Sequence, residues 1–462
     1  MSIFHPIDSI LRKRDGRALS DKEIHNFISA VVERTDEKPL ISDAQIAAFL
    51  MAVFLRGLNP RELAALTREM RFSGDTFDAA PLKTFTIDKH STGGVGDKTS
   101  LLIAPVMAAA GIAHPTSEGV PGICVPMISG RALGHTGGTL DMLETIPGFN
   151  TQLDLKQLSE VLRRCGAALI GQTPRVVPAD RILYALRDHT GTVESPYLIA
   201  ASIMSKKLAE SLNALVLDVK VGCGAFMPTN EESRQLAQLM VELGEAAGTR
   251  TVALLTAMEE PLGRFSGNWV GVWECVDILR GRRHPMSSDL IELSNTLAGW
   301  MLHLACQAAT PEEGARLADH YLQSGEAYKA WMRIIEAQGG DTKVFEDPAA
   351  HHKPALTSVF KAPKSGYLAS VDCKQIGWAI QRLGAGRAKP GDPVSAHAGL
   401  ESHAKVGDRL EEGQPLYTLF CEDCERLTEP KEMLGEAIRI TDAPPEKQSI
   451  IRDVVASKAS KL

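Results

Sequence analysis

The sequence has little that would direct it to nucleic acid, to a membrane or to secretion. Its 462 residues carry a formal net charge of −7 and contain no basic cluster, so neither nucleic acid nor an anionic membrane surface is an expected partner. The longest apolar run, Leu101–Ala113, is too short to span a bilayer and contains Pro105. Residues 1–11 lack the basic and then apolar layout of a signal peptide.

Cysteine is scarce and scattered. Eight cysteines spread over 462 residues are typical of reduced cytosolic thiols and not of a disulfide framework. Cys421 and Cys424 form a lone C-x-x-C pair, and the second pair of ligands that a zinc site needs is not evident. We therefore expect a cytoplasmic protein without a metal site.

The chain is long enough for two or three domains, and its 44% hydrophobic and 23% charged residues are ordinary for a globular protein. The first domain is helical. Ser20 and Ser42 each begin a capping box, with Glu or Gln three residues later, and Asn59 followed by proline begins a third helix that Gly74 ends. The short loops between them predict a small helical bundle over residues 1–72.

The pattern changes after residue 82, where short apolar segments alternate with helical ones. Strands are expected at 84–88, 125–128, 167–170, 214–220 and 251–256. The alternation of strands and helices over 82–172 and again over 213–345 predicts parallel strands with right-handed crossovers.

Two helices, expected at 178–188 and 195–212, follow each other with no strand between them, so residues 178–211 are predicted to rejoin the helical bundle. Residues 350–462 contain short β segments with glycine and proline. The expected fold is therefore α/β with two domains: a small all-α domain from two chain segments and a larger α/β domain with a mostly parallel central sheet. A C-terminal α+β subdomain follows them.

A glycine-rich motif, KHSTGGVGDKTS, runs from Lys89 to Ser100 between an expected strand and helix. Glycines let backbone N–H groups approach an anion, and a helix N-terminus adds a favourable partial charge. Lys89 supplies a full charge, and Ser91 and Ser100 supply hydroxyl donors. The motif is neither a Walker A loop nor a dinucleotide fingerprint, because Asp97 follows Gly96. A purely structural turn is the alternative, with about equal weight for the glycines alone.

A second glycine-rich motif, SGRALGHTGGTLD, follows the next strand and runs from Ser129 to Asp141. Loops at the carboxyl ends of parallel strands face one crevice, so Ser129 and Thr139 are expected to donate to the same anion. A third element lies on the two inserted helices. Ser202 and Lys206 are four residues apart and share a helix face, and Arg187 ends the preceding helix. From spacing alone, a solvated basic face is the more common interpretation of the Lys206-Lys207 doublet.

The three motifs together closely resemble the thymidine phosphorylase and pyrimidine-nucleoside phosphorylase family. The resemblance covers nearly the whole chain, is most specific at 129–144, and extends to 88–100, 171–173, 201–210, 218–227 and 383–387. It implies a homodimer that transfers a pentosyl group from a pyrimidine to inorganic phosphate, with phosphate as a co-substrate and no cofactor. The residues implied to bind phosphate are Lys89, Ser91, Ser100, Ser129 and Thr139. Those implied to bind the pyrimidine are His90, Arg187, Ser202 and Lys206.

In the implied reaction, phosphate attacks C1′ of the sugar and the pyrimidine leaves, so no protein nucleophile is needed. Arg187 and Lys206 would stabilise charge on the departing ring, and His90 would donate a proton or a hydrogen bond to a ring carbonyl. These three are the candidate catalytic residues. Base and phosphate would lie on opposite walls of a cleft, which domain closure would bring together.

The sequence departs from the family pattern at four positions without losing a proposed contact residue: Cys223 for Ser, Ala132 for Gly, Ser211 for Gly and His189 for an apolar residue. Residues 112–125 form an insertion relative to the family. Because it follows a helix and precedes a strand, the segment His114 to Cys124 is expected at the amino ends of the strands, across the sheet from phosphate. A role in packing or subunit contact is predicted for it.

Three alternatives remain open. A phosphoribosyltransferase of the anthranilate phosphoribosyltransferase fold would need magnesium on paired acids, which Asp218-Val219-Lys220 does not offer. A nucleotide (AMP) phosphorylase fits the His90 loop and the Ser129–Thr139 signature less well. A non-catalytic binding protein would have lost cationic or hydroxyl residues that are all present. Thymidine is the expected substrate, although the sequence does not fix the preference among thymidine, deoxyuridine and uridine.

Overall fold

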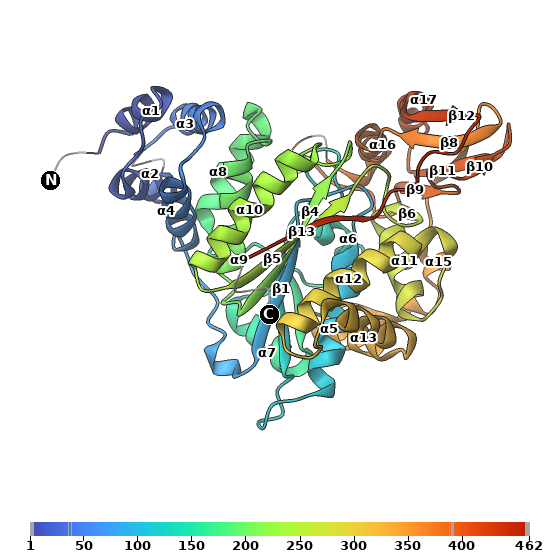
Figure 1. Cartoon of the computed structure of the whole chain (residues 1–462), viewed down its shortest axis with the longest axis horizontal. Helices are drawn as coiled ribbons and strands as arrows, with labels where there is room; N and C mark the ends of the chain where they lie inside the picture. The colour runs from blue at the N-terminus through green and yellow to red at the C-terminus, as the bar shows by residue number, and fades with distance from the viewer. Residues whose placement is uncertain (1–3, 36, 38, 388, 390–391, 458–462) are drawn as a thin grey trace.

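The computed structural model describes residues 4–35, 37, 39–387, 389 and 392–457. An α/β domain lies in the centre, with the helical domain on one side of it and the C-terminal domain on the other (Figure 1). No helix in the described part has the length and apolar character that crossing a bilayer requires.

The helical domain is built from two chain segments, as predicted. Its helices are α1 (Pro6–Arg14), α2 (Asp21–Glu33), α3 (Asp43–Arg56), α4 (Pro60–Arg71), α8 (Pro178–Thr190) and α9 (Pro196–Leu208). The capping boxes at Ser20, Ser42 and Asn59 form, and α8 and α9 pack against α2, α3 and α4. The prediction of three helices in the first segment was wrong, because α1 precedes them. Its N-cap, His5, makes no side-chain capping bond, so the usual polar start signal is missing.

The central sheet is mostly parallel, which confirms the expected fold class. Its strands are β1 (Phe85–Ser91), β2 (Ile123–Ser129), β3 (Ala167–Gly171), β4 (Ala214–Val221), β5 (Arg250–Ala257) and β13 (Ile451–Ala456). They lie in the order β13-β5-β4-β1-β2-β3, and every neighbouring pair is parallel except β13 with β5. The carboxyl ends of β1 to β5 therefore meet at one edge of the sheet.

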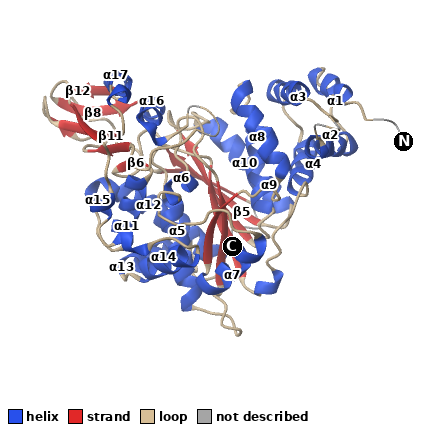
Figure 2. Cartoon of the chain, turned by 180° about the vertical axis from the view of Figure 1, so that it is seen from behind, coloured by secondary structure: helices blue, strands red, loops and turns tan. Residues whose placement is uncertain are grey.

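Helices cover both faces of this sheet (Figure 2). They are α5 (Thr99–Ala113), α6 (Thr139–Leu143), α7 (Leu155–Cys165), α10 (Asn230–Ala246), α11 (Trp269–Leu279), α12 (Ser288–Leu304), α13 (Pro311–Gln323) and α14 (Glu326–Ala337). The most apolar of them, α5, packs on β2 and β3 and under α12, α13 and α14. Its enclosure explains the longest apolar run of the sequence, since a helix that is apolar all round must be buried on all sides.

The C-terminal domain contains two small sheets, β10-β8-β12 and β6-β9-β11-β7. Its elements are β6 (Phe265–Gly267), α15 (Pro348–His351), β7 (Leu356–Lys361), β8 (Gly366–Val371), α16 (Cys373–Ile380), β9 (Gly399–Ser402), β10 (Arg409–Leu410), β11 (Pro415–Cys421), α17 (Thr428–Ala437) and β12 (Ile438–Thr441). The expected boundaries, 213–345 and 350–462, need correction at two strands. β6 falls within 213–345 but pairs with β9 of the C-terminal domain. β13 falls within 350–462 but pairs with β5 of the central sheet, where it covers an otherwise open sheet edge. Residues 458–462 lie outside the described part.

The insertion connects α5 to β2 at the amino end of the strand, as predicted, and is the teal loop at the bottom of Figure 1. It is shorter than expected, since β2 already begins at Ile123 and the connection spans 114–122. The loop closes on itself where the Thr116 amide donates to Val120 O at 2.8 Å and the Gly119 amide donates to Thr116 O at 2.9 Å. The tip is exposed, whereas Val120 is buried.

We predict that the tip is dispensable for catalysis. Replacing residues 116–119 by a two-residue turn should leave the expected phosphorolysis within about twofold of that of the unaltered chain, because exposed loop tips tolerate length changes and this one lies across the sheet from the phosphate loops. Steady-state phosphorolysis and a thermal melt measure the outcome. A shortened protein that folds but no longer binds phosphate would place the loop in the active site.

Candidate active site

A cavity of about 370 Å³ opens at the carboxyl edge of the sheet, between β1, β2 and their following loops on one side and α8 and α9 on the other. This volume is in the range of small-molecule sites. All nine residues singled out from the sequence line it: Lys89, His90, Ser91, Ser100, Ser129, Thr139, Arg187, Ser202 and Lys206. Segments more than 100 residues apart in the chain are thus brought to one place.

At the end of β1, the side chains of Lys89, His90 and Ser91 alternate between the two faces of the sheet. β1 is longer than the expected 84–88 and pairs with β4 through Lys89, His90 and Ser91. Successive strand residues point to opposite faces, so Lys89 and Ser91 share one face and His90 occupies the other. Lys89 is 2% exposed, and its ammonium donates to Thr99 Oγ1 at 2.6 Å and to Ser100 Oγ at 3.5 Å, at the start of α5.

The start of α5 is built to receive an anion. Asp97 accepts hydrogen bonds from the Thr99 amide and hydroxyl, at 3.2 and 2.8 Å. Burial opposes the charge of Asp97, but Lys220 and Lys89 outweigh burial and hold the pKa of Asp97 well below its usual value. Lys220 also pairs with Asp218 at 2.7 Å. Among the residues that the structure describes, Lys89 has no carboxylate within 4.0 Å, so its buried charge is left for a ligand.

The second glycine-rich loop lies directly against the first. Ser129 ends β2 and Thr139 begins α6, and the Gly137 amide donates to Gly94 O at 3.1 Å. The Asp141 carboxylate fixes this loop from behind by accepting from the Ala132 amide at 2.7 Å. Arg131 and, from the C-terminal domain, Arg387 also bind that carboxylate. Together with Lys89 the two loops form the cradle, defined here as Lys89 and residues 91–100 and 129–139.

The opposite wall carries a lysine from α9. Lys206 donates to Ser202 Oγ at 2.9 Å, as their spacing predicted, and forms an ion pair with Asp180 of α8. Burial lowers the pKa of Lys206, and Asp180 opposes that shift. The interpretation of the Lys206-Lys207 doublet as a solvated face was wrong. The Lys206 side chain is 15% exposed and that of Lys207 is fully buried, because α9 packs against the sheet and the helical bundle.

Arg187 lines the cavity, but its guanidinium donates its hydrogen bonds to backbone carbonyls. Its Nε, Nη1 and Nη2 atoms donate to the carbonyls of Thr192, Leu198 and Val193 at 3.2, 3.1 and 2.6 Å. The guanidinium therefore fixes the turn between α8 and α9 in addition to placing a positive charge near the cavity. Its predicted contact with the pyrimidine stays a prediction.

His90 lies on the side of β1 that faces α9. Burial, together with the positive charges of Lys207, Lys206 and Lys89, lowers the pKa of His90 well below its usual value. The imidazole is therefore neutral at pH 7. A neutral ring can donate one hydrogen bond but is a poor source of a proton, so the geometry favours the hydrogen-bonding role of the two considered for His90.

Several cavity residues were not singled out from the sequence, among them Asp180, Tyr184 and Phe226. Asp180 and Tyr184 lie on the same face of α8 as Arg187, and the Tyr184 ring is 5.7 Å from Lys206 Nζ and 5.8 Å from Arg187 Cζ. Their regular helical spacing before Arg187 was the available signal. Phe226 comes from the loop after β4, within the segment of family resemblance at 218–227, which gave it no role.

The site offers poor support for a magnesium-dependent alternative. Asp218, the acid considered for it, is fully buried and bound by Lys220 and the Thr256 hydroxyl. Within the described ranges, no group of three His, Cys, Asp or Glu side chains is arranged to hold a metal ion. What the cavity does contain is a cationic, hydroxyl-rich cradle facing a second cationic wall.

Comparison with known proteins agrees with this geometry. Residues 83–328 match the glycosyl transferase family a/b domain, residues 7–74 match the helical bundle domain of the same family, and residues 367–441 match the pyrimidine nucleoside phosphorylase C-terminal domain. A crystal structure of anthranilate phosphoribosyltransferase from Thermus thermophilus covers 72% of this chain and 99% of its own, with a TM-score of 0.55. At 21% identity that likeness shows the fold alone.

Two curated relatives align over nearly their whole length. The thymidine phosphorylase of Agrobacterium fabrum is 42% identical over 96% of this chain and 97% of its own. The pyrimidine-nucleoside phosphorylase of Geobacillus stearothermophilus is 38% identical over 97% of this chain and 99% of its own. The chain therefore belongs to the family of the thymidine and pyrimidine-nucleoside phosphorylases.

Proposed function

We propose that this protein catalyses the reversible phosphorolysis of pyrimidine nucleosides, with thymidine as its substrate, to give the free base and 2-deoxyribose 1-phosphate. The observation that carries the proposal is the buried ammonium of Lys89. It donates to hydroxyls at the start of α5 and has no carboxylate partner among the described residues. A phosphate dianion is the counter-ion that this place suits, because the helix N-terminus and the cradle amides add further donors.

The two walls divide the work. Phosphate binds Lys89, Ser91, Ser100, Ser129 and Thr139. The pyrimidine binds His90, Arg187, Ser202 and Lys206. Phosphate oxygen forms a bond to C1′ as the bond from C1′ to the ring nitrogen breaks, and the bonding electrons pass to the ring. Lys206 and Arg187 stabilise that negative charge, and neutral His90 donates a hydrogen bond to a ring carbonyl. The nucleophile is a substrate, so the reaction calls for no organic cofactor.

The helical domain supports a homodimer. Four large apolar side chains are exposed on α1 and α3, which pack against each other: Ile7, Met51, Phe54 and Leu55. Met51, Phe54 and Leu55 lie three and four residues apart and so share one helix face. A second copy of the chain is the proposed partner for this face, because an isologous contact would bury the same apolar residues twice. The cytoplasmic location expected from the sequence stays a prediction.

The activity itself can be tested directly. We expect the purified protein to release thymine from thymidine only when inorganic phosphate is present, with a sugar 1-phosphate formed in equal amount. Chromatography of base and sugar products measures both. Equal release of base without phosphate would identify a hydrolase, and turnover only with phosphoribosyl pyrophosphate and magnesium would identify the phosphoribosyltransferase alternative.

Lys206 should matter for the chemical step. Lys206→Met removes a charge donor aimed at the leaving base and should lower kcat/KM by about 100-fold or more. In the unaltered chain kcat/KM should fall as pH rises, beginning below the usual pKa of lysine, because burial lowers the pKa of Lys206 and only its charged form serves. Lys206→Arg should move this fall to higher pH. A pH profile that Lys206→Arg leaves unchanged would remove Lys206 from the chemistry.

Arg187→Ala, unlike Lys206→Met, should lower the stability of the protein as well as its rate. It leaves three backbone carbonyls without their donor, so it should lower the free energy of unfolding by about 1–3 kcal/mol in addition to lowering the rate. Denaturant unfolding measures the stability. An unchanged free energy of unfolding would show that these backbone contacts do not hold the turn between α8 and α9.

The dimer can be tested on α3. Leu55 is 70% exposed in the single chain, so Leu55→Asp should cost little folding stability but should place two charges in the proposed interface. Size-exclusion chromatography with light scattering should show a dimer for the unaltered chain and a monomer for the variant. A variant that remains a dimer would locate the contact elsewhere.

A further inference from the structure

One buried lysine of the cradle has no part in the reaction proposed above. Lys98 immediately precedes α5, and its side chain is 1% exposed. The ammonium donates to the carbonyl oxygens of Gly96, Leu262 and Phe265 at 2.8, 2.8 and 2.7 Å, and pairs with Glu274 Oε2 at 3.0 Å. One ammonium thus holds together oxygen atoms from the cradle, from the 262–265 segment and from α11.

The cradle and the 262–265 segment are pressed against each other around this ammonium. The Leu262 amide donates to Val95 O at 3.0 Å. Gly96 has φ of +71°, and a Cβ atom there would lie 2.6 Å from both Leu262 O and Ser266 Oγ. There is no room for a side chain at Gly96, so the two segments meet backbone to backbone.

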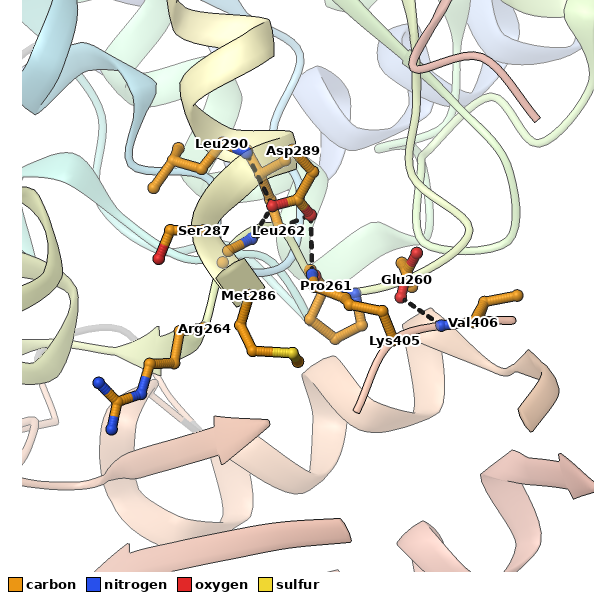
Figure 3. A network of polar contacts seen from close by, with 12 residues as sticks. Glu260, Pro261, Leu262, Arg264, Met286, Ser287, Asp289, Leu290, Lys405 and Val406 are labelled. Carbon is orange, nitrogen blue, oxygen red and sulfur yellow. Dashed lines mark hydrogen bonds and ion pairs between the residues drawn. The ribbon is translucent and has the colours of Figure 1, made fainter. Parts of the chain in front are cut away.

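The C-terminal domain fixes the other side of that segment (Figure 3). Lys405 donates to Pro261 O at 2.6 Å and pairs with Asp289 at 2.7 Å, and Asp289 accepts from the Gly263 amide at 3.2 Å. Burial opposes the charge of Lys405, but Asp289 and Glu260 outweigh burial and raise its pKa. The segment is therefore anchored between α12 and the loop after β9, and it gives Lys98 a rigid surface to bind.

We infer that Lys98 is a positioning residue for phosphate. Its ammonium holds the cradle against the anchored 262–265 segment and thereby sets the position of Ser100, which lines the cavity and is proposed to bind phosphate. Lys98 itself does not line the cavity. Without its charge, three carbonyl oxygens and the Glu274 carboxylate would face one another in a buried space, and the cradle would have to move to separate them. The inference rests on the proposed assignment of phosphate to the cradle.

The test is Lys98→Met, which keeps the aliphatic stem and removes the ammonium. We expect the KM for phosphate to rise by about tenfold or more, as for other residues that orient a binding group, while the KM for thymidine changes by less than about twofold. Ammonium chloride should restore part of the phosphate affinity, because an ammonium ion fits the vacated place among the four oxygens. Tetramethylammonium chloride at equal ionic strength should not, because the ion is too large.

Three further variants make the result decisive. Lys361→Met, on an exposed residue of β7, controls for loss of one positive charge and should leave both KM values unchanged. Lys98→Gln keeps two N–H donors and should give an intermediate phosphate KM; it replaces Lys98→Met if that variant does not fold. Lys89→Met tests the cradle itself.

The inference is overturned if a folded Lys98 variant keeps its phosphate KM while Lys89→Met raises it, or if both salts act alike. An unchanged phosphate KM in Lys89→Met would instead refute the assignment of phosphate to the cradle.

Discussion

One buried ion network joins the three elements that carry the active site. Lys207, on the last turn of α9, donates to Asp88 of β1, to Glu210 at 2.7 Å and to Ile128 O of β2 at 2.8 Å. All three charged side chains are fully buried. Asp88 immediately precedes Lys89, and Ile128 immediately precedes Ser129. A single ammonium therefore fixes the strands that end in Lys89 and Ser129 relative to the helix that carries Ser202 and Lys206.

In this network one ammonium faces two acidic side chains. Burial, and after it the neighbouring Asp88 carboxylate, raises the pKa of Glu210 well above its usual value. The two carboxylates outweigh burial at Lys207 and raise its pKa. One ammonium is thus shared by two carboxyl groups, and burial makes the negative charge of Glu210 the harder of the two to keep. Breaking such a pair from one side is costly, because the remaining charge stays buried.

How much the sequence could foretell depended on whether the signal was local. The cradle was found because Lys89, Ser91 and Ser100 share one glycine-rich motif between a strand and a helix, and the capping boxes of α2, α3 and α4 are equally local. The burial of Lys206 and Lys207 was not predicted, because it depends on the packing of α9 against strands that are distant in the sequence. The spacing of these residues alone favoured a solvated face. The strand β13 was not predicted for the same reason. It pairs with β5, and the whole C-terminal domain lies between the two strands in the sequence. Roles for Arg187 and His90 came only from family resemblance.

The arrangement of counter-charges suits the two ligands proposed for the cavity. On the base wall Lys206 is already paired with Asp180, so it suits a neutral ring that becomes negative only as it leaves. In the cradle, Lys220 pairs with Asp218 and helps to hold Asp97 ionised, which leaves Lys89 to a permanent anion. Exchanging the proposed ligands would place a dianion beside Asp180 and a neutral ring beside Lys89, which has no carboxylate within 4.0 Å among the described residues. Each wall thus suits the charge that its proposed ligand carries during the reaction.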